Sequence, residues 1–175
     1  MKIWLTLFFS ISLLAACSSP ADKEMRAGRR AAESGAFKEA LGHFDRVIKR
    51  NTESRQAVQS AIEGSKIAHY DIKNYEKALE YYRFIIRFSA NLPERLDAQK
   101  KIAEIYFQAL QAYEKAIIEL GKLADITENL FEKAEVKLNI ARSNYYLGQF
   151  DQARAEIAEV LRMPLDENGH FQAMS

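Results

Sequence analysis

The sequence predicts an all-α chain folded as a helical solenoid of about four helix–turn–helix repeats. Apolar residues recur at helical spacing along most of the chain, and an aromatic residue returns at a nearly constant interval of thirty-seven or thirty-eight positions. No segment alternates apolar and polar residues as a half-buried strand would. With 175 residues, the chain has room for one ordinary domain or a short repeat array.

Four amphipathic helices are predicted at this interval. Each begins at the repeated aromatic residue, has an alanine three residues later, and has large apolar residues seven and ten positions later. These offsets fall on one face of an α-helix. The aromatic and alanine pairs are Phe37 and Ala40, Tyr75 and Ala78, Tyr113 and Ala116, and Phe150 and Ala153.

Four further helices are predicted between them, over residues 20–33, 54–72, 93–110 and 130–147. Ser19 is expected to cap the first, with Pro20 at its first position and Asp22 three residues after the cap. Chain reversals are expected at Ser34-Gly35, Lys73-Asn74 and Leu147-Gly148, where Gly or Asn tolerates a left-handed backbone.

The helices then pair into units over residues 20–53, 54–92, 93–129 and 130–162, followed by a tail over residues 163–175. The third unit is expected to be apolar nearly all round its second helix, as an interior repeat should be. No solvating helix follows the fourth unit. This leaves open a truncated chain or a terminal face that pairs with another subunit.

The units resemble the tetratricopeptide repeat, although the interval of thirty-seven or thirty-eight positions between the aromatic residues is longer than the common repeat of about 34 residues. Gly28, Gly35, Phe37, Ala40 and Phe44 match the family signature in the first unit. The fourth unit keeps Ala141, Gly148, Phe150 and Ala153, whereas Lys73 and Gln111 replace the turn glycine of the second and third. The resemblance implies a tetratricopeptide-like solenoid.

Residues 1–16 are predicted to be an export signal. Lys2 precedes an uncharged run from Ile3 to Ala16, which would rise about 21 Å as a helix, short of a membrane core of roughly 30 Å. A buried core helix is the alternative, but the run has no polar face.

The junction Leu14-Ala15-Ala16-Cys17 resembles the lipobox of bacterial lipoproteins. The resemblance implies cleavage before Cys17, diacylation of its sulfur, and a linker over residues 17–19. Because Ser18 rather than Asp follows, it also implies sorting to the outer membrane, facing the periplasm. A free thiol is the alternative.

Composition and motifs give no indication of catalysis. The single Cys excludes an intramolecular Cys-based zinc site, and the 25 basic and 24 acidic side chains leave no charge excess to attract nucleic acid. His43, His69 and His170 lack partners at metal-ligand spacing, and no nucleophile or phosphate-loop motif occurs. We therefore expect no enzyme, metal or cofactor.

The tetratricopeptide register implies a concave surface lined by the first helix of each unit, including Ile67 and Ile105. It places a partner-binding groove at Tyr70, Gln108, Arg142, Tyr145 and Tyr146. Tyr and Arg combine apolar contact area with hydrogen bonding. The alternative is that several of these tyrosines are core residues between helices.

The predicted function is a membrane-anchored scaffold that binds protein partners in the cell envelope. The design resembles lipoproteins that serve β-barrel assembly, envelope constriction or pilus secretion, and it does not choose among them. The alternative is a non-catalytic lipoprotein that binds peptidoglycan or another glycan. The oligomeric state stays open.

Overall fold

The computed structural model describes residues 19–165, so the predicted signal, the Cys17 junction and residues 166–175 of the tail lie outside the described residues. Residues 19–165 form helices and no strand, which confirms the predicted fold class. The helices are α1 (Pro20–Glu33), α2 (Phe37–Arg50), α3 (Arg55–Lys66), α4 (Tyr75–Phe88), α5 (Leu92–Glu104), α6 (Tyr113–Ile126), α7 (Leu130–Tyr146) and α8 (Phe150–Leu161). Two π-helical segments, η1 (Ile67–Asp71) and η2 (Ile105–Ala109), continue α3 and α5.

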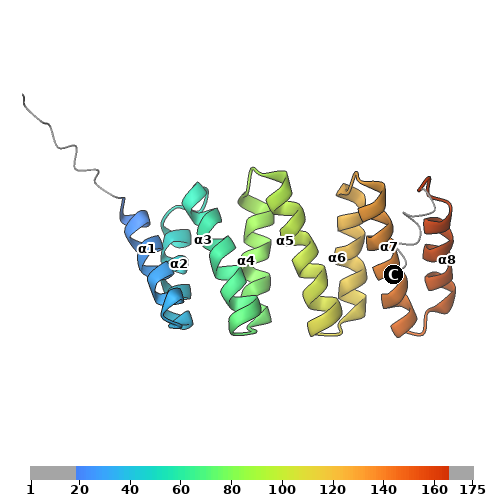
Figure 1. Cartoon of the computed structure of the whole chain (residues 1–175), viewed down its shortest axis with the longest axis horizontal. Helices are drawn as coiled ribbons and strands as arrows, with labels where there is room; N and C mark the ends of the chain where they lie inside the picture. The colour runs from blue at the N-terminus through green and yellow to red at the C-terminus, as the bar shows by residue number, and fades with distance from the viewer. Residues whose placement is uncertain (1–18, 166–175) are drawn as a thin grey trace, which may run out of the picture.

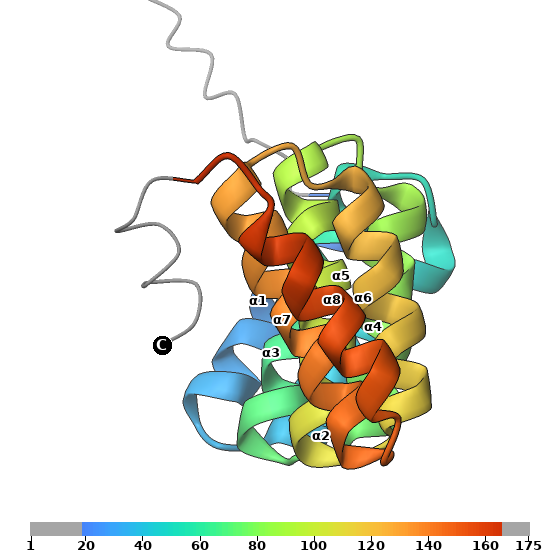
Figure 2. The ribbon, with the colours of Figure 1, turned by 90° about the vertical axis from the view of Figure 1, so that its right-hand side faces the viewer.

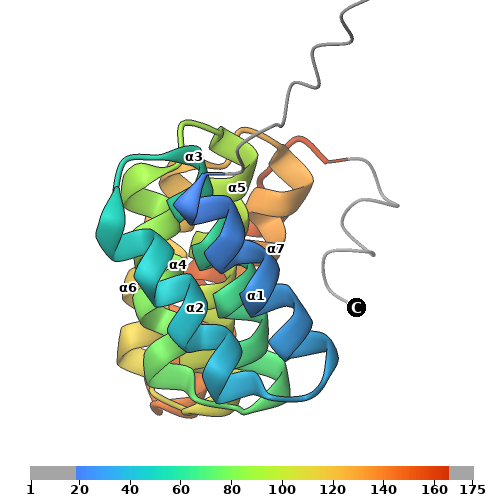
Figure 3. The same ribbon diagram turned by 90° about the vertical axis from the view of Figure 1, so that its left-hand side faces the viewer.

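The helices stand side by side in chain order along one row (Figure 1). Each helix packs mainly against the one before it and the one after it. Seen along the row from either end, they form two layers (Figures 2 and 3). We call the layer of α1, α3, α5 and α7 the first-helix layer. The turn inside each unit lies at one edge of the row, and the connections between units lie at the other.

The repeated alanines allow the two layers to approach closely. Ala40, Ala78 and Ala116 are fully buried, and Ala153 is nearly so. One apolar core runs from the first unit into α7, and a smaller cluster around Val160 joins α7 to α8. The four predicted aromatic residues each occupy the first position of α2, α4, α6 or α8, so they stand at equivalent places in the repeat.

Helix caps follow the predicted chemistry at the start of the row. The Ser19 hydroxyl accepts a hydrogen bond from the Asp22 amide at 3.1 Å, and the Asp22 carboxylate accepts one from the Ser19 amide. One reversal differs from the prediction. Lys73, with φ of 51°, takes the left-handed backbone, while Asn74 caps α4 through its side chain.

The second and third units each have one residue more before the aromatic residue than the first and fourth units. This additional residue lies in the π-helical segment. Each unit closes its turn with a backbone hydrogen bond that spans five or six residues and is accepted by the carbonyl of Ala31, Ala68, Tyr106 or Asn144. The next aromatic residue follows six positions after Ala31 and Asn144 but seven after Ala68 and Tyr106. A π-turn closes its bond one residue later than an α-turn and so absorbs this additional residue.

The expectation that the third unit's second helix has no solvent face is wrong, and the last helix is more exposed than its equivalents. Ile118, in the third unit's second helix, is 58% exposed, so that helix has a solvent face. Phe150 and Ile157 of α8 are 54% and 39% exposed, whereas Leu120, at the position equivalent to Ile157, is buried. Within residues 19–165 no further unit packs on α8, and its outer side stays uncovered (Figure 2).

Candidate partner-binding cleft

The five residues predicted to share one groove lie in three places. Gln108 lines a cleft between α5 and α7. A second hollow, between α7 and α8, is lined by Arg142, Tyr145 and Tyr146. Tyr70 lies apart from both and faces Lys101 of α5, whose Nζ is 5.8 Å from the centre of the Tyr70 ring.

The predicted tyrosines are not core residues. Tyr70, Tyr145 and Tyr146 are half-exposed or more. The register was wrong for Ile67 and Ile105, which are buried rather than available on a surface. The register counts back eight positions from the aromatic residue, and in these two units that count crosses the additional π-helical residue, so it selects a position one residue away from the equivalent of Arg29 and Arg142.

The cleft between α5 and α7, which we call the α5–α7 cleft, is the site that the structure supports best. It has a volume of about 370 Å³, within the range of ligand pockets. Both walls pack against α6, but α5 and α7 make little contact with each other. Its apolar floor is formed by Leu96, Ala103, Phe107, Leu120, Leu123 and Val136.

Neighbouring helices of the first-helix layer meet at three junctions, α1–α3, α3–α5 and α5–α7. The side chains at equivalent positions differ among them, and this difference leaves the third junction open. Glu63, Lys101 and Asn139 occupy the same position of successive repeats, on α3, α5 and α7. Glu63 is held by Arg29 of α1 at 2.6 Å, so the first junction is bridged. Lys101 lies against Tyr70 and is paired with Glu104 at 2.7 Å, so the second junction is bridged as well.

At the third junction the bridging pair is missing. Gln108 replaces Tyr70, and Asn139 replaces Lys101. Asn139 instead accepts a hydrogen bond from Arg142 of its own helix at 3.2 Å, and no hydrogen bond joins it to Gln108 in the described part of the chain. Shorter, uncharged side chains therefore leave the space between α5 and α7 unfilled.

The rim of the cleft is acidic. Asp97, Glu104, Glu132 and Glu135 line it together with Lys100. Glu104 is neutralised by Lys101, but the other three carboxylates form no ion pair among residues 19–165. Burial alone would lower the pKa of Lys101, but the bonds to Glu104 and Tyr70 outweigh burial and raise it, so its charge is held at the second junction.

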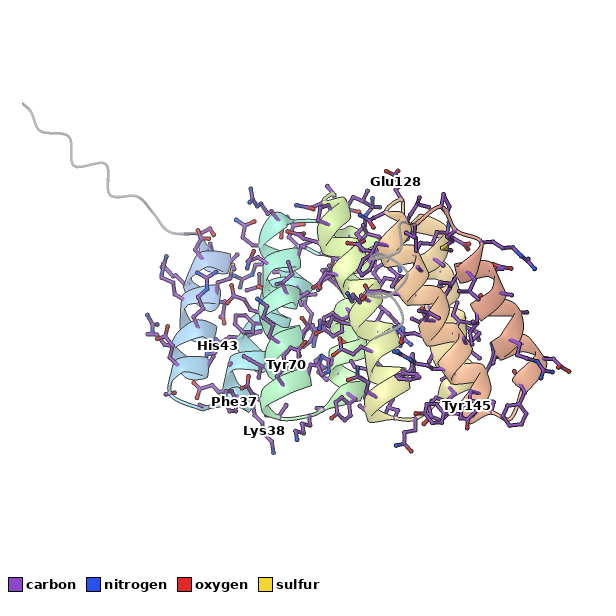
Figure 4. All side chains as sticks on the ribbon, turned by 45° about the vertical axis from the view of Figure 1, so that its right-hand side comes forward. Phe37, Lys38, His43, Tyr70, Glu128 and Tyr145 are labelled. Atoms are coloured by element: carbon purple, nitrogen blue, oxygen red, sulfur yellow. The ribbon has the colours of Figure 1, made fainter. Side chains whose placement is uncertain are left out.

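Aromatic side chains close the cleft at the edge where the unit turns lie. The ring of Phe107, in η2, lies 6.1 Å from that of Tyr146, in α7, and Tyr146 stacks on Tyr113 at 4.9 Å. Tyr145 and Phe150 extend this cluster toward the end of the row at 5.5 Å. Figure 4 shows Tyr145 at this edge and Glu128 at the opposite one.

The two histidines of the described residues, His43 and His69, each contact neighbouring side chains within the fold. His43 bonds to the Glu24 carboxylate at 2.7 Å. His69 is buried, stacks on Tyr70, and lies 3.2 Å from the Tyr82 hydroxyl. Residues 19–165 contain no group of three or more His, Cys, Asp or Glu placed to hold a metal ion. His170 lies outside the described residues.

Sequence reasoning missed Asp97, Glu132, Glu135 and Asn139. The tetratricopeptide register points to the last two turns of each first helix, whereas the cleft extends toward the start of α5 and α7. The signal available was the spacing of 132, 135 and 139, which places two acids and an amide along one side of a helix.

None of the described helices is both long and apolar enough to span a membrane.

The comparisons with known proteins agree with this architecture. Residues 67–129 match the family described as "Tetratricopeptide repeat". The structure is similar to that of MamA, with a TM-score of 0.58 and 16% identity over 83% of this chain and 79% of the other. It is also similar to BtubC (BKLC) from P. vanneervenii, with a TM-score of 0.57 and 13% identity.

The second likeness covers 88% of this chain and 64% of BtubC, so this chain spans less than two thirds of that protein's length. No curated protein matches the chain in sequence. At such low identities the two structures indicate the fold alone. The described chain therefore has the tetratricopeptide-repeat fold, and its central residues 67–129 match that family in sequence.

Proposed function

We propose that the chain is a membrane-anchored scaffold that binds protein partners in the bacterial cell envelope and helps assemble or coordinate a complex there. The observation that carries the binding role is the α5–α7 cleft, an apolar floor with a polar rim on the first-helix layer. Tetratricopeptide repeats suggest protein–protein interaction, and the fold is typically a non-catalytic scaffold. Binding rather than catalysis is the role we assign.

The envelope location rests on the sequence of residues 1–17. Cys17 precedes the start of α1 by three residues, and each residue spans at most about 3.5 Å. A diacylated Cys17 would therefore hold the first unit close to the bilayer, because two acyl chains anchor a protein stably.

The anchor is tested by Cys17→Ala. We expect the wild-type chain to incorporate labelled palmitate and to fractionate with outer membranes, and the variant to do neither while keeping its helical circular dichroism. A variant that stays in the outer-membrane fraction without label would overturn the lipid anchor.

The scaffold role is tested by photocrosslinking in cells, with a photoreactive residue at Asn139 in the cleft. Lys38, an exposed residue at the turn edge of α2, is the matched control position (Figure 4). We expect a discrete adduct with an envelope protein from position 139 and none from position 38. Equal adducts from both positions, or none from position 139, would contradict the proposal. The adduct's identity would distinguish barrel assembly, envelope constriction and pilus secretion.

A second test addresses the sequence-predicted residues near the α7–α8 hollow. Arg142→Ala with Tyr145→Ala should weaken capture of that partner without unfolding the array, because both side chains are exposed. Loss of helical circular dichroism in the double variant would show that these residues are structural.

Glycan binding is the second candidate, favoured by the exposed rings of Tyr145, Tyr146 and Phe150. Flat aromatic faces offer apolar surface that a sugar ring can cover. Sedimentation with purified sacculi tests it: glycan binding requires that the wild type co-sediment and that Tyr145→Ala with Phe150→Ala reduce the bound fraction. A wild-type chain that stays in the supernatant excludes this role.

A further inference from the structure

We infer that the α5–α7 cleft selects a basic, amphipathic segment of a protein partner, whose apolar side chains enter the cleft while its Lys or Arg side chains meet the acidic rim. This inference rests on the proposed scaffold function and adds the chemistry of the partner. The open junction, the charge of the rim and the length of the walls support it.

The charge of the rim disfavours an acidic partner. Asp97, Glu132 and Glu135 have no ion-pair partner within residues 19–165, and Lys100 offsets one of these charges. Many other acids of the described chain are already paired, among them Glu24, Glu63, Asp45 and Glu156. A free carboxylate group beside apolar surface repels anions and attracts Lys or Arg, so it discriminates between partners by charge.

The apolar floor requires that the partner also bring apolar side chains. Leu120, Leu123 and Val136 are buried below the rim, and Leu96 and Phe107 are partly exposed at its sides. A segment with only basic side chains would leave the apolar floor in contact with water. A segment with apolar and basic residues at helical spacing presents one apolar side and one charged side.

The length of the cleft sets the length of the segment. The wall formed by α5 and η2 runs from Leu96 to Gln108, which corresponds to about 18 Å at about 1.5 Å per residue. A helical segment of about 12 residues spans this distance. The cleft is thus as long as roughly three turns of a partner helix, which would lie over the rim with its apolar side chains in the cleft, and it ends at the Phe107–Tyr146 contact.

The test measures binding of synthetic peptides to the full chain in nanodiscs of zwitterionic lipid, with empty nanodiscs as reference. The basic probe is an amphipathic helical peptide, one turn longer than the cleft, with Leu on one side and Lys on the other. The acidic probe replaces every Lys by Glu. Fluorescence anisotropy should show that the wild type binds the basic probe about tenfold more tightly, and that added salt weakens this binding.

The variants test the rim charge, by removing two carboxylates, and the open junction, by filling it with a bridging pair that also adds one positive charge. Glu132→Gln with Glu135→Gln should weaken the basic probe about threefold to tenfold. Its matched control is Glu33→Gln with Asp71→Asn, which removes two exposed charges far from the cleft and should change nothing. Gln108→Tyr with Asn139→Lys rebuilds the Tyr70–Lys101 bridge at the open junction and should abolish binding of the basic probe.

Circular dichroism and urea midpoints establish that each variant is folded. Equal binding of both probes by the wild type, or unchanged binding of the basic probe by the Glu132/Glu135 variant, would overturn the inference. An adduct from position 139 without a preference for the basic probe would leave the scaffold role intact and refute the charge selection. The basic preference without any adduct would count against the scaffold role instead.

Discussion

At two glycines, a buried aromatic ring of the next helix lies close against the backbone. A Cβ built at Gly28 would lie 2.7 Å from Cε1 of Phe44, and one at Gly64 would lie 2.9 Å from Cζ of Tyr81. Both rings are almost fully buried, and the Tyr81 hydroxyl donates to Asp45 at 2.7 Å. Neither ring can move without losing its packing.

Gly28→Ala should therefore lower the free energy of unfolding by about 1–3 kcal/mol through overpacking. Gly121→Ala is the matched control, because nothing lies within 4 Å of its built Cβ and it sits inside α6. That change should raise stability by up to about 1 kcal/mol, since Ala suits a helix interior better than Gly. Urea unfolding of both variants checks the pair, and a Gly28→Ala midpoint at or above the wild-type value would contradict the packing argument.

The buried imidazole of His69 gives a second prediction at the residue scale. Burial lowers its pKa below the ordinary 6.5, Glu104 acts against this shift, and Lys101 adds to it. The ring also contacts Tyr70, Tyr75 and the Tyr82 hydroxyl. The folded state therefore binds a proton less readily than the unfolded chain.

Because the folded pKa is the lower one, stability from this site is present above the unfolded pKa and is lost as the pH falls below about 6.5. The free energy of unfolding of the wild type should decline more steeply between about pH 7 and pH 5 than that of His69→Gln. Urea titrations at several pH values measure both slopes. Parallel slopes would show that His69 does not contribute.

At the scale of elements, the turn inside each unit needs one residue with a left-handed backbone, and two kinds of residue supply it. Gly35 and Gly148 take a left-handed backbone with φ of 77° and 75°, which costs Gly little. Lys73 and Gln111 take the same region with φ of 51° and 48°, after the π-helical segments. For a residue with a Cβ this conformation costs roughly 1–2 kcal/mol.

Gln111→Gly should relieve that strain and raise the free energy of unfolding by about 0.5–1 kcal/mol after the greater entropy of the unfolded Gly is counted. Gly148→Ala should have the opposite effect, because Ala there gains the same strain. Denaturant midpoints compare the two variants, and destabilisation by Gln111→Gly would mean that its side chain makes contacts worth more than the strain.

At the scale of the whole molecule, stability should be uneven along the row. Each unit contacts mainly its neighbours, so the helix at an end of the described row has one neighbour instead of two. Leu120 of α6 is 5% exposed, while the equivalent Ile157 of α8 is 39% exposed. The fourth unit therefore contributes less buried area than the third.

Leu120→Ala should cost about 2–5 kcal/mol, the usual range for a buried leucine, and Ile157→Ala should cost roughly 1 kcal/mol. In hydrogen exchange, amides of α8 should exchange faster than those of α4 and α6, because opening the end breaks one interface. Protection of α8 equal to that of α6 would indicate that its outer side is covered in solution.

The repeat pattern alone determined much of the architecture. The period, the aromatic residues and the alanines located the helices to within one or two residues, and Ser19 and Asp22 located the first cap. Local signals suffice here because helix faces, caps and close contacts at Ala are each specified within a few neighbouring residues.

Tertiary structure decided the π-turns, the burial of Ile67 and Ile105, and the α5–α7 cleft. A shift of one hydrogen-bond step has no clear local pattern, yet it rotates every side chain that follows. The cleft depends on Gln108 and Asn139, which are far apart in the sequence and lie on elements that hardly touch. A missing contact between distant positions has no periodicity, so it becomes visible only when the equivalent junctions are compared in space.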